Sequence, residues 1–332
     1  MARNKMVLNY IGSKRSLAQR LVNEFKKEWA DLSGYTFCDA FAGTGALAVQ
    51  MAPHVKTVMV NDWENFSVAI LHAQFNPPST ATQLVNALNL VTPTTGAITT
   101  TYSELGNRLY FTTLNAQKID GIRIALRSQN YTHVERNYLK GALVSAADSI
   151  ANVASIYGAY LKDFKNSATN PITLRPIQSA ARQAQVFQRD AQELCLDGTV
   201  IEPTTLLYLD PPYNQRQYGA NYFPLNAIVD ISANTFEVAG ITGIPTAGYK
   251  KSAWCSTKTA TQALKTILEG TPARRLALSY NQEGILSHAE ITALFTATGW
   301  QVRRIEIPYK RFASQKDLEP NTIEYLFVAT RI

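Results

Sequence analysis

Residues 204–223 read TTLLYLDPPYNQRQYGANYF, and the rest of the chain is best interpreted outward from this stretch. The apolar run at residues 206–209 is typical of a strand buried on both faces of a parallel sheet. Pro211 and Pro212 lack the N–H that a central strand donates, so we expect the strand to end at Asp210 and a stiff loop to follow. In open α/β sheets, ligands bind beyond the carboxyl ends of the strands, which makes this loop a candidate active site.

The loop combines groups that suit a planar ring carrying an exocyclic amine. The carboxylate of Asp210 and the carbonyl of Pro211 can both accept hydrogen bonds from an NH2 group. Tyr213 can stack on the face of the ring, a contact that contributes about 1–3 kcal/mol for a nucleobase. A capping Asp before a proline-rich turn would explain Asp-Pro alone, but the full motif favours a catalytic loop formed by Asp210, Pro211, Pro212 and Tyr213.

The motif DPPY with its extension NQRQYGANYF resembles the D12 class of adenine-specific (N6) DNA methyltransferases, and so does LSYNQEGILS at residues 278–287. That class includes DNA adenine methylases and the modification enzymes of restriction systems. The resemblance implies transfer of a methyl group from S-adenosyl-L-methionine to the N6 amine of adenine in a short duplex DNA sequence, with the base flipped out of the stack and without a metal. It also implies an α/β, Rossmann-like methyltransferase fold with a mostly parallel sheet.

A second motif, TFCDAFAGTG at residues 36–45, predicts a strand, a glycine turn and then a helix. The two glycines allow the backbone to approach a ligand closely. With Ala48 in the third position of the pattern, the glycines alone leave NAD binding open. The resemblance favours S-adenosylmethionine instead, and it implies that the cofactor is bound by Asp39, Phe41, Gly43 and Gly45.

Two further segments fit the same cofactor. Residues 57–62 read as a second strand that ends at Asp62, whose carboxylate can accept hydrogen bonds from ribose hydroxyls; a helix cap is the alternative role. Residues 9–14, NYIGSK, form a turn before a helical pattern at 17–29, although an ordinary capped surface helix would look the same. The resemblance implies that this turn binds the methionine end of the cofactor through Tyr10, Gly12 and Lys14. It also assigns Asp190, in FQRDA, to the cofactor's adenine amine, with an exposed loop acid as the alternative, and counts Asp210 among the cofactor-binding residues.

The segment between these motifs predicts a separate subdomain. Residues 119–126 and 138–164 have apolar residues at helical spacing, with Arg123 and Arg127 among nearby tyrosines. Such residues suit phosphate and base contacts, although a helical subdomain with a solvated basic face has the same composition. We therefore expect a discontinuous catalytic domain at 1–75 and 176–332, and a mainly helical target-recognition insertion at 76–175.

Three residues after the catalytic loop are further candidates for DNA contacts. Arg216 can reach a phosphate, and Tyr218 and Tyr222 can support or cover a flipped base; packing within the loop is the alternative for each. Further along, the pattern predicts a strand at 275–280 and a helix at 287–295 with a capping box. Residues 302–307 and 324–330 read as a closing antiparallel hairpin.

Composition limits the remaining possibilities. The 332 residues are 46% hydrophobic and 17% charged, which is typical of a globular protein. Lys and Arg number 32 against 25 Asp and Glu, so the net charge of +7 fits a polyanion such as double-stranded DNA. The three cysteines have no metal or disulfide spacing, and no signal peptide or membrane span is evident, so we expect a cytoplasmic protein.

Rival functions explain less of the sequence. An RNA adenine N6 or DNA cytosine N4 methyltransferase would use the same amine chemistry, but those groups more often have Asn or Ser in place of Asp210. An NAD-dependent enzyme would leave residues 210–213 unexplained. A non-catalytic DNA-binding protein would need neither a cofactor motif nor an amine-binding loop. A cognate restriction endonuclease is compatible with the resemblance as a partner.

Overall fold

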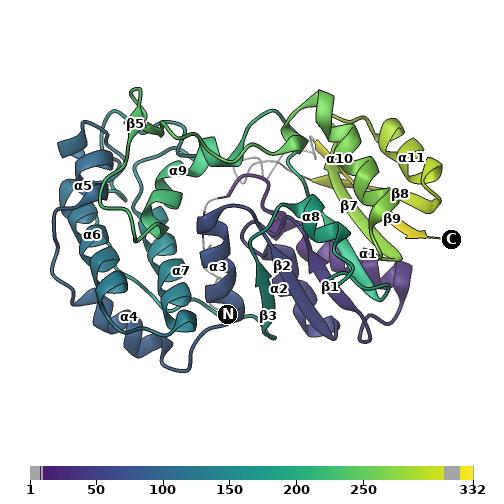
Figure 1. The fold of residues 1–332 in the computed structure, drawn as a ribbon, viewed down its shortest axis with the longest axis horizontal. Helices are drawn as coiled ribbons and strands as arrows, with labels where there is room; N and C mark the ends of the chain where they lie inside the picture. Colours follow the sequence, from purple (N-terminus) through teal and green to yellow (C-terminus); the bar gives the residue numbers. More distant parts are fainter. Residues whose placement is uncertain (1–7, 9, 310–321, 332) are drawn as a thin grey trace. The chain divides into compact units, whose positions relative to one another are not determined.

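The computed structural model describes residues 8, 10–309 and 322–331, and the chain divides into two compact units (Figure 1). The unit that we call the sheet unit comprises residues 14–63, 181–217 and 251–332. The other, which we call the helical unit, comprises residues 1–13, 64–180 and 218–250. Each is described by itself, over its described residues.

Seven strands of the described chain form one sheet in the sheet unit. Their order is β3-β2-β1-β4-β7-β9-β8; the first five are parallel, and β9 runs antiparallel to both β7 and β8. The strands are β1 (Thr36–Asp39), β2 (Thr57–Asn61), β3 (Ala184–Phe187), β4 (Thr205–Leu209), β7 (Arg275–Asn281), β8 (Trp300–Tyr309) and β9 (Thr322–Arg331). The predicted Rossmann-like α/β class, a mostly parallel sheet with a terminal antiparallel hairpin, is confirmed.

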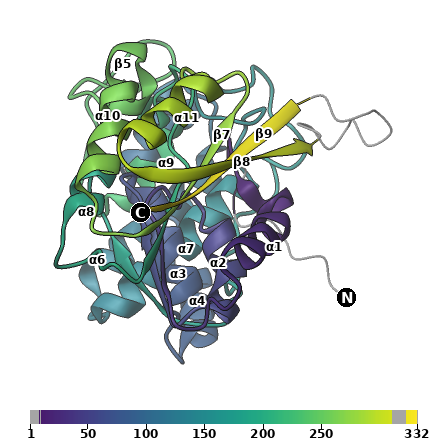
Figure 2. The ribbon, with the colours of Figure 1, turned by 90° about the vertical axis from the view of Figure 1, so that its right-hand side faces the viewer.

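Both faces of the sheet are covered, and the central strands β1 and β4 are therefore buried over almost their whole length. Because side chains alternate along β4, Leu207 and Leu209 join the core beneath three helices, whereas Tyr208 faces the other way. These helices are α8 (Ala191–Leu196), α10 (Thr257–Gly270) and α11 (His288–Ala297). The ring of Tyr208 lies 6.0 Å from that of Phe25 on α1 (Ala18–Trp29). Figure 2 shows α10 and α11 on one side of the strands and α1 on the other.

The helices of the sheet unit lie between and after these strands. They are η1 (Lys14–Ser16), α1 (Ala18–Trp29), α2 (Ala46–Met51), η2 (Ala52–His54), α8 (Ala191–Leu196), η4 (Ala253–Cys255), α10 (Thr257–Gly270) and α11 (His288–Ala297). The predicted capping box at the start of α11 is confirmed, with Ser287 and Glu290 satisfying each other's backbone N–H groups.

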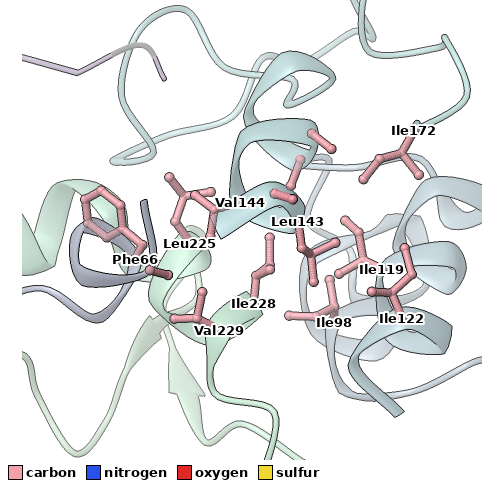
Figure 3. Packing of buried hydrophobic residues seen from close by; sticks show 14 of the residues in the cluster. Phe66, Ile98, Ile119, Ile122, Leu143, Val144, Ile172, Leu225, Ile228 and Val229 are labelled. Atoms are coloured by element: carbon pink, nitrogen blue, oxygen red, sulfur yellow. The ribbon is translucent and has the colours of Figure 1, made fainter. Parts of the chain in front are cut away.

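The helical unit is built around an aliphatic and aromatic core (Figure 3). In Figure 3, Leu143 and Val144 lie between Leu225 and Ile228 on one side and Ile119 on the other. The elements are α3 (Asn65–Phe75), α4 (Ala81–Asn89), α5 (Ala97–Tyr102), η3 (Glu104–Gly106), α6 (Thr113–Ser128), α7 (His133–Ser149) and α9 (Tyr218–Val229), with a small hairpin of β5 (Val238–Ala239) and β6 (Ile244–Pro245).

The helical pattern expected over residues 138–164 is wrong beyond Ser149, where α7 ends. The chain then folds back as a loop that Asn152 ties together, because its side chain donates to Leu161 O at 3.0 Å and accepts from Lys165 N at 3.0 Å. Val153 and Tyr157 are nevertheless buried. A loop that packs against a helical core can therefore place apolar residues at helix-like intervals.

The boundaries between the two units also differ from the predicted ones. Helix α3 and residues 218–250 belong to the helical unit, although we expected the insertion to cover only residues 76–175. The reason is packing: Phe66 and Ile70 of α3, and Leu225 and Ile228 of α9, are fully buried in the helical core. Because α3 and α9 directly follow the cofactor and catalytic motifs in the sequence, we expected them to belong to the catalytic domain.

Gly141 tests the packing of α3 against α7. A methyl group at this position would overlap the carbonyl oxygen of Ala69 and lie 2.6 Å from Cβ of Ala73. We expect Gly141→Ala to lower the free energy of unfolding by about 1–3 kcal/mol, measured by urea denaturation. Gly158→Ala, where a methyl would meet only ordinary contacts at 3.8 Å, is the matched control. Equal stability of the two variants would contradict the packing described for α3 and α7.

Candidate active site

Asp39 and Asp210 lie at the carboxyl ends of two neighbouring parallel strands. Asp39 ends β1, Asp210 directly follows β4, and the register pairs Asp39 with Tyr208. From β1 the sheet extends through β2 to β3, and from β4 it extends the other way through β7. The two acids therefore lie at the topological switch point, which is where open α/β sheets bind their ligands.

A buried lysine connects Asp210 to a second carboxylate. Nζ of Lys14 lies 2.6 Å from Oδ1 of Asp210 and 3.1 Å from Oε1 of Glu324, which is on β9. The side chains of Lys14 and Glu324 are 6% and 1% exposed, and that of Asp210 is 14% exposed. Two carboxylates thus share one cation in a place that water hardly reaches.

Burial controls the ionisation of these groups. It raises the pKa of Asp210 to about 6, with Lys14 opposing the rise and Glu324 adding to it. Burial alone would lower the pKa of Lys14, but the carboxylates of Asp210 and Glu324 raise it well above its usual value. Lys14 is therefore protonated, while Asp210 gains or loses its proton near neutral pH.

Asp39 is a third buried acid of the site. Burial raises its pKa well above the usual range, and the charge of Asp210 raises it further, although the N–H of Phe41 stabilises the carboxylate. Among the described residues, Oδ1 of Asp39 is buried without a hydrogen-bond partner. A buried oxygen of this kind is costly unless a ligand donates to it, and a cationic ligand would restore its charge.

The loop after Asp210 is fixed by contacts with the turn after β7. The carbonyl of Tyr213 accepts a hydrogen bond of 2.9 Å from Ile285 N, and its ring packs edge-on against Tyr280 at 6.0 Å. Nζ of Lys14 lies 5.6 Å from the centre of the Tyr213 ring. Asp210, Lys14 and Tyr213 thus bring an acid, a cation and an aromatic ring together in the sheet unit.

The glycine turn after β1 is fixed by the end of β2. Gly43 and Gly45 have φ values of +52° and +71°, a conformation that favours glycine. Asp62 anchors this turn, because its Oδ2 accepts a hydrogen bond of 2.8 Å from Gly43 N. Asn61, which the sequence did not single out, connects the turn to the loop after β3 by donating to Ala40 O at 3.0 Å and to Arg189 O at 3.1 Å.

Other residues expected to bind the cofactor are distributed over both units. Phe41 packs edge-on against Trp254 at 5.6 Å in the sheet unit. Asp190 is the N-cap of α8, with Oδ1 accepting hydrogen bonds from Gln192 N and Glu193 N. Tyr10 and Gly12 belong to the helical unit.

The residues expected to contact DNA differ in exposure. Arg123 is 4% exposed, and its guanidinium is paired with Asp120 at 2.9 Å and donates to Asp230 O at 2.6 Å. Arg123 therefore holds the helical unit together and does not present its charge to a phosphate. Arg127 and Arg216 are exposed, Tyr218 is half-buried and Tyr222 is fully buried.

Sequence reasoning missed Glu324. Its signal was a single acid in the otherwise apolar and aromatic run TIEYLFVA at residues 322–329. An acid that points into a core requires a buried partner, but the partner is 310 positions earlier in the chain and could not be named from the pattern.

The order of the strands defines a Rossmann-like fold, with buried acids at its switch point. The chain belongs to the D12 class of N6 adenine-specific DNA methyltransferases, whose sequence profile matches residues 10–288.

Curated relatives support this assignment along the whole chain. The type II methyltransferase M.CviAII of Paramecium bursaria Chlorella virus 1 is 35% identical over 334 residues, which cover 96% of this chain and 97% of the relative. M.NlaIII of Neisseria lactamica is 34% identical over 97% of this chain and 98% of its own length. M.FokI of Planomicrobium okeanokoites is 29% identical over 96% of this chain, which corresponds to 52% of that protein.

Two features are absent from the described residues. No group of three or more His, Cys, Asp or Glu in the described part of the chain is arranged to hold a metal ion. Within residues 8, 10–309 and 322–331, no helix has the length and apolarity needed to cross a membrane.

Lys14 tests the electrostatic account of the site. We expect Lys14→Met to lower the free energy of unfolding by about 3–5 kcal/mol at pH 8, because it leaves buried carboxylates without their cation. The loss should be smaller at pH 5, where Asp210, whose pKa is about 6 in the intact protein, is protonated.

The matched control is Lys27→Met, which removes an exposed lysine paired with Glu24 at 2.7 Å. It should cost at most about 1 kcal/mol at either pH, since exposed ion pairs contribute little. A Lys14→Met variant as stable as this control at pH 8 would contradict the buried cluster.

Proposed function

We propose that this protein transfers a methyl group from S-adenosyl-L-methionine to the N6 amine of adenine within a short duplex DNA sequence. Its enzyme class would be that of the site-specific DNA methyltransferases that act on adenine. The observation that carries the proposal is the rigid loop after β4, in which Asp210 is held by a buried cation beside the carbonyl of Pro211 and the ring of Tyr213. Membership of the D12 class supports adenine as the substrate.

The residues at the switch point fit a methyl donor that carries positive charge. When bound, S-adenosylmethionine supplies an electrophilic methyl group on a sulfonium. At this site the buried acids Asp39, Asp210 and Glu324 surround the cation of Lys14, and Oδ1 of Asp39 has no hydrogen-bond partner within the described residues. We assign Asp39, Phe41, Gly43, Gly45 and Asp62 to the donor, with Tyr10, Gly12, Lys14 and Asp190 as further contacts.

The proposed chemistry requires little acid–base catalysis. An aromatic amine is a poor nucleophile, because its lone pair is delocalised into the ring. If Asp210 and the carbonyl of Pro211 accept hydrogen bonds from its two N–H groups, the nitrogen becomes pyramidal and its lone pair can attack the methyl carbon. The N–C bond would form as the C–S bond of the donor breaks, the donor would leave as a neutral thioether, and the methylated amine would then lose one proton to Asp210 or water. The ionised form of Asp210 is the better acceptor, and the positive charge of Lys14 favours that form. The rest of the rate enhancement comes from positioning.

The target adenine must leave the helix to reach this loop. In duplex DNA the amine lies inside the base stack, so the base is flipped out, and Tyr213 stacks on its ring. Pro212 stiffens the turn that places Tyr213 beside Asp210.

We assign DNA recognition to the helical unit, which contains the segment expected from the sequence to read the target. Arg127 of this unit is exposed and is the candidate for a phosphate contact, and the exposed Arg216 of the sheet unit is a second candidate. The net charge of +7 favours binding to DNA.

Two properties of the relatives bear on the biological role. M.CviAII, M.NlaIII and M.FokI are named as type II methyltransferases, and StsI of Streptococcus sanguinis, 30% identical over 98% of this chain, is named a modification methylase. We infer that this protein modifies DNA as part of a restriction-modification system in the cytoplasm, with a cognate restriction endonuclease as its partner.

Expression in a host without DNA methylation tests the reaction. Long-read sequencing should detect N6-methyladenine in one sequence context in cells that make the wild-type protein. Asp210→Ala should abolish the mark while purified protein still binds duplex DNA, because the acceptor of the amine is lost and the DNA-binding surface is intact.

Asp163→Ala, which removes an exposed acid of the helical unit, is the control and should leave the mark in place. Full methylation by Asp210→Ala would rule out the assignment of Asp210. An unmarked genome in cells with folded wild-type protein would rule out DNA adenine as the substrate.

A further inference from the structure

Both polar groups of the Ile11 backbone are held by tyrosines that follow the catalytic loop in the sequence. Ile11 N donates a hydrogen bond of 2.8 Å to the hydroxyl of Tyr222. The hydroxyl of Tyr218 donates one of 3.2 Å to Ile11 O. All three residues belong to the helical unit, although Ile11 is more than 200 positions away from either tyrosine in the chain.

Ile11 lies within a tight turn that needs this support. Ser13 N donates to Tyr10 O at 3.3 Å, and Gly12 has a φ of +75°, so residues 10–13 form a β-turn with glycine in its third position. Neither bond to Ile11 is part of the turn itself. They fix the orientation of its central residue relative to α9.

Ring packing reinforces the same contact. The Tyr10 ring lies 5.3 Å from those of Tyr218 and Tyr222, and these two stack on each other at 6.2 Å. Phe66 of α3 packs against Tyr222 at 5.1 Å. Two hydroxyl groups of this cluster of aromatic rings, those of Tyr218 and Tyr222, thus bond to the backbone of a single residue, Ile11.

The shape of α9 places Tyr222 in this stack. The helix is interrupted at Tyr222, which has φ −134° and ψ 18°, and Pro224 lies in the first turn of the segment that continues. Tyr222 is fully buried, and burial raises its pKa, so the phenol remains neutral. Because the Tyr222 ring is fully buried, it has no exposed face on which a flipped base could stack.

We propose that Tyr218 and Tyr222 are positioning residues for the methyl donor: they hold the turn at residues 10–13 in the conformation that binds it. This inference rests on the proposed function, which assigns Tyr10 and Gly12 to the donor. It replaces the expectation from the sequence that these two tyrosines support or cover a flipped base.

The test separates binding of the donor from binding of DNA. Tyr222→Phe keeps the ring but leaves the half-buried Ile11 N–H without its acceptor, so the Kd for S-adenosyl-L-methionine, measured by calorimetry, should rise about tenfold. Tyr218→Phe should have a smaller effect, because a carbonyl that loses one donor is less costly than an unpaired N–H. The Kd for a duplex that contains the methylation site should be unchanged in both variants.

Tyr138→Phe is the matched control. Its hydroxyl also accepts a backbone N–H, from Ile177 at 3.0 Å, and its ring is fully buried in the same core, but the N–H that it binds is not part of the turn at residues 10–13. It should leave the Kd for the donor unchanged. The proposal is overturned if Tyr138→Phe weakens donor binding as much as Tyr222→Phe does, or if Tyr222→Phe weakens DNA binding and leaves donor binding intact.

Hydrogen exchange of the ligand-free protein separates this proposal from the proposed function. The Ile11 amide should exchange slowly in the wild type and in Tyr138→Phe, and at least tenfold faster in Tyr222→Phe, as expected when a buried hydrogen bond of about 1–3 kcal/mol is lost. Equal exchange in all three proteins would overturn the role of Tyr222. A wild type that fails to bind S-adenosylmethionine, yet shows this pattern, would refute the proposed function alone.

Discussion

The site depends on one buried cation held between two carboxylates. Lys14 lies within 2.6 Å of Asp210 and 3.1 Å of Glu324, and this arrangement compensates for most of the cost of burying an acid at the end of β4. Without Lys14, burial would drive Asp210 toward its protonated form, which is a poorer acceptor for an amine. Without Glu324, Lys14 would pair with Asp210 alone and would stabilise the charge on Asp210 more strongly. Burial, Lys14 and Glu324 together set the pKa of Asp210 at about 6, so both of its protonation states are populated near that pH.

The fold explains how residues from the two ends of the chain meet. Asp210 follows a central parallel strand, Lys14 begins the short helix before α1, and Glu324 lies on the antiparallel strand β9 that pairs with β7. The parallel strands bring Asp39 and Asp210 to one edge of the sheet, and the antiparallel hairpin adds the second acid. Because the glycine turn after β1 is tied to Asp62 and Asn61, the ends of three strands are mutually fixed before any ligand binds. Such preorganisation is what a reaction governed by positioning requires.

Much of this was predictable from local patterns, and the remainder depends on contacts between distant segments. Three features are determined by residues within ten positions of one another, and all three form in the structure. They are the apolar run before Asp210, the glycine turn and the capping box at Ser287. Arg123 had a sequence environment typical of a phosphate ligand, but its partners Asp120 and Asp230 make it structural. Tyr222 resembled part of a substrate-binding loop, and a kinked helix buries it instead. In each of these cases the decisive partner is a side chain or a backbone group that no local periodicity identifies.

The central claim is that methyl transfer requires Asp210 in its ionised form, with a pKa set by burial, Lys14 and Glu324. The most direct measurement is the pH dependence of single-turnover methyl transfer to duplex DNA by the wild type and by Glu324→Gln. The account predicts that the wild-type rate falls as the pH drops through about 6, and that the midpoint lies at lower pH in the variant, since the charge of Glu324 raises the pKa of Asp210. A rate that stays constant through pH 6 in the wild type, or a midpoint that does not move or moves to higher pH in Glu324→Gln, would contradict it.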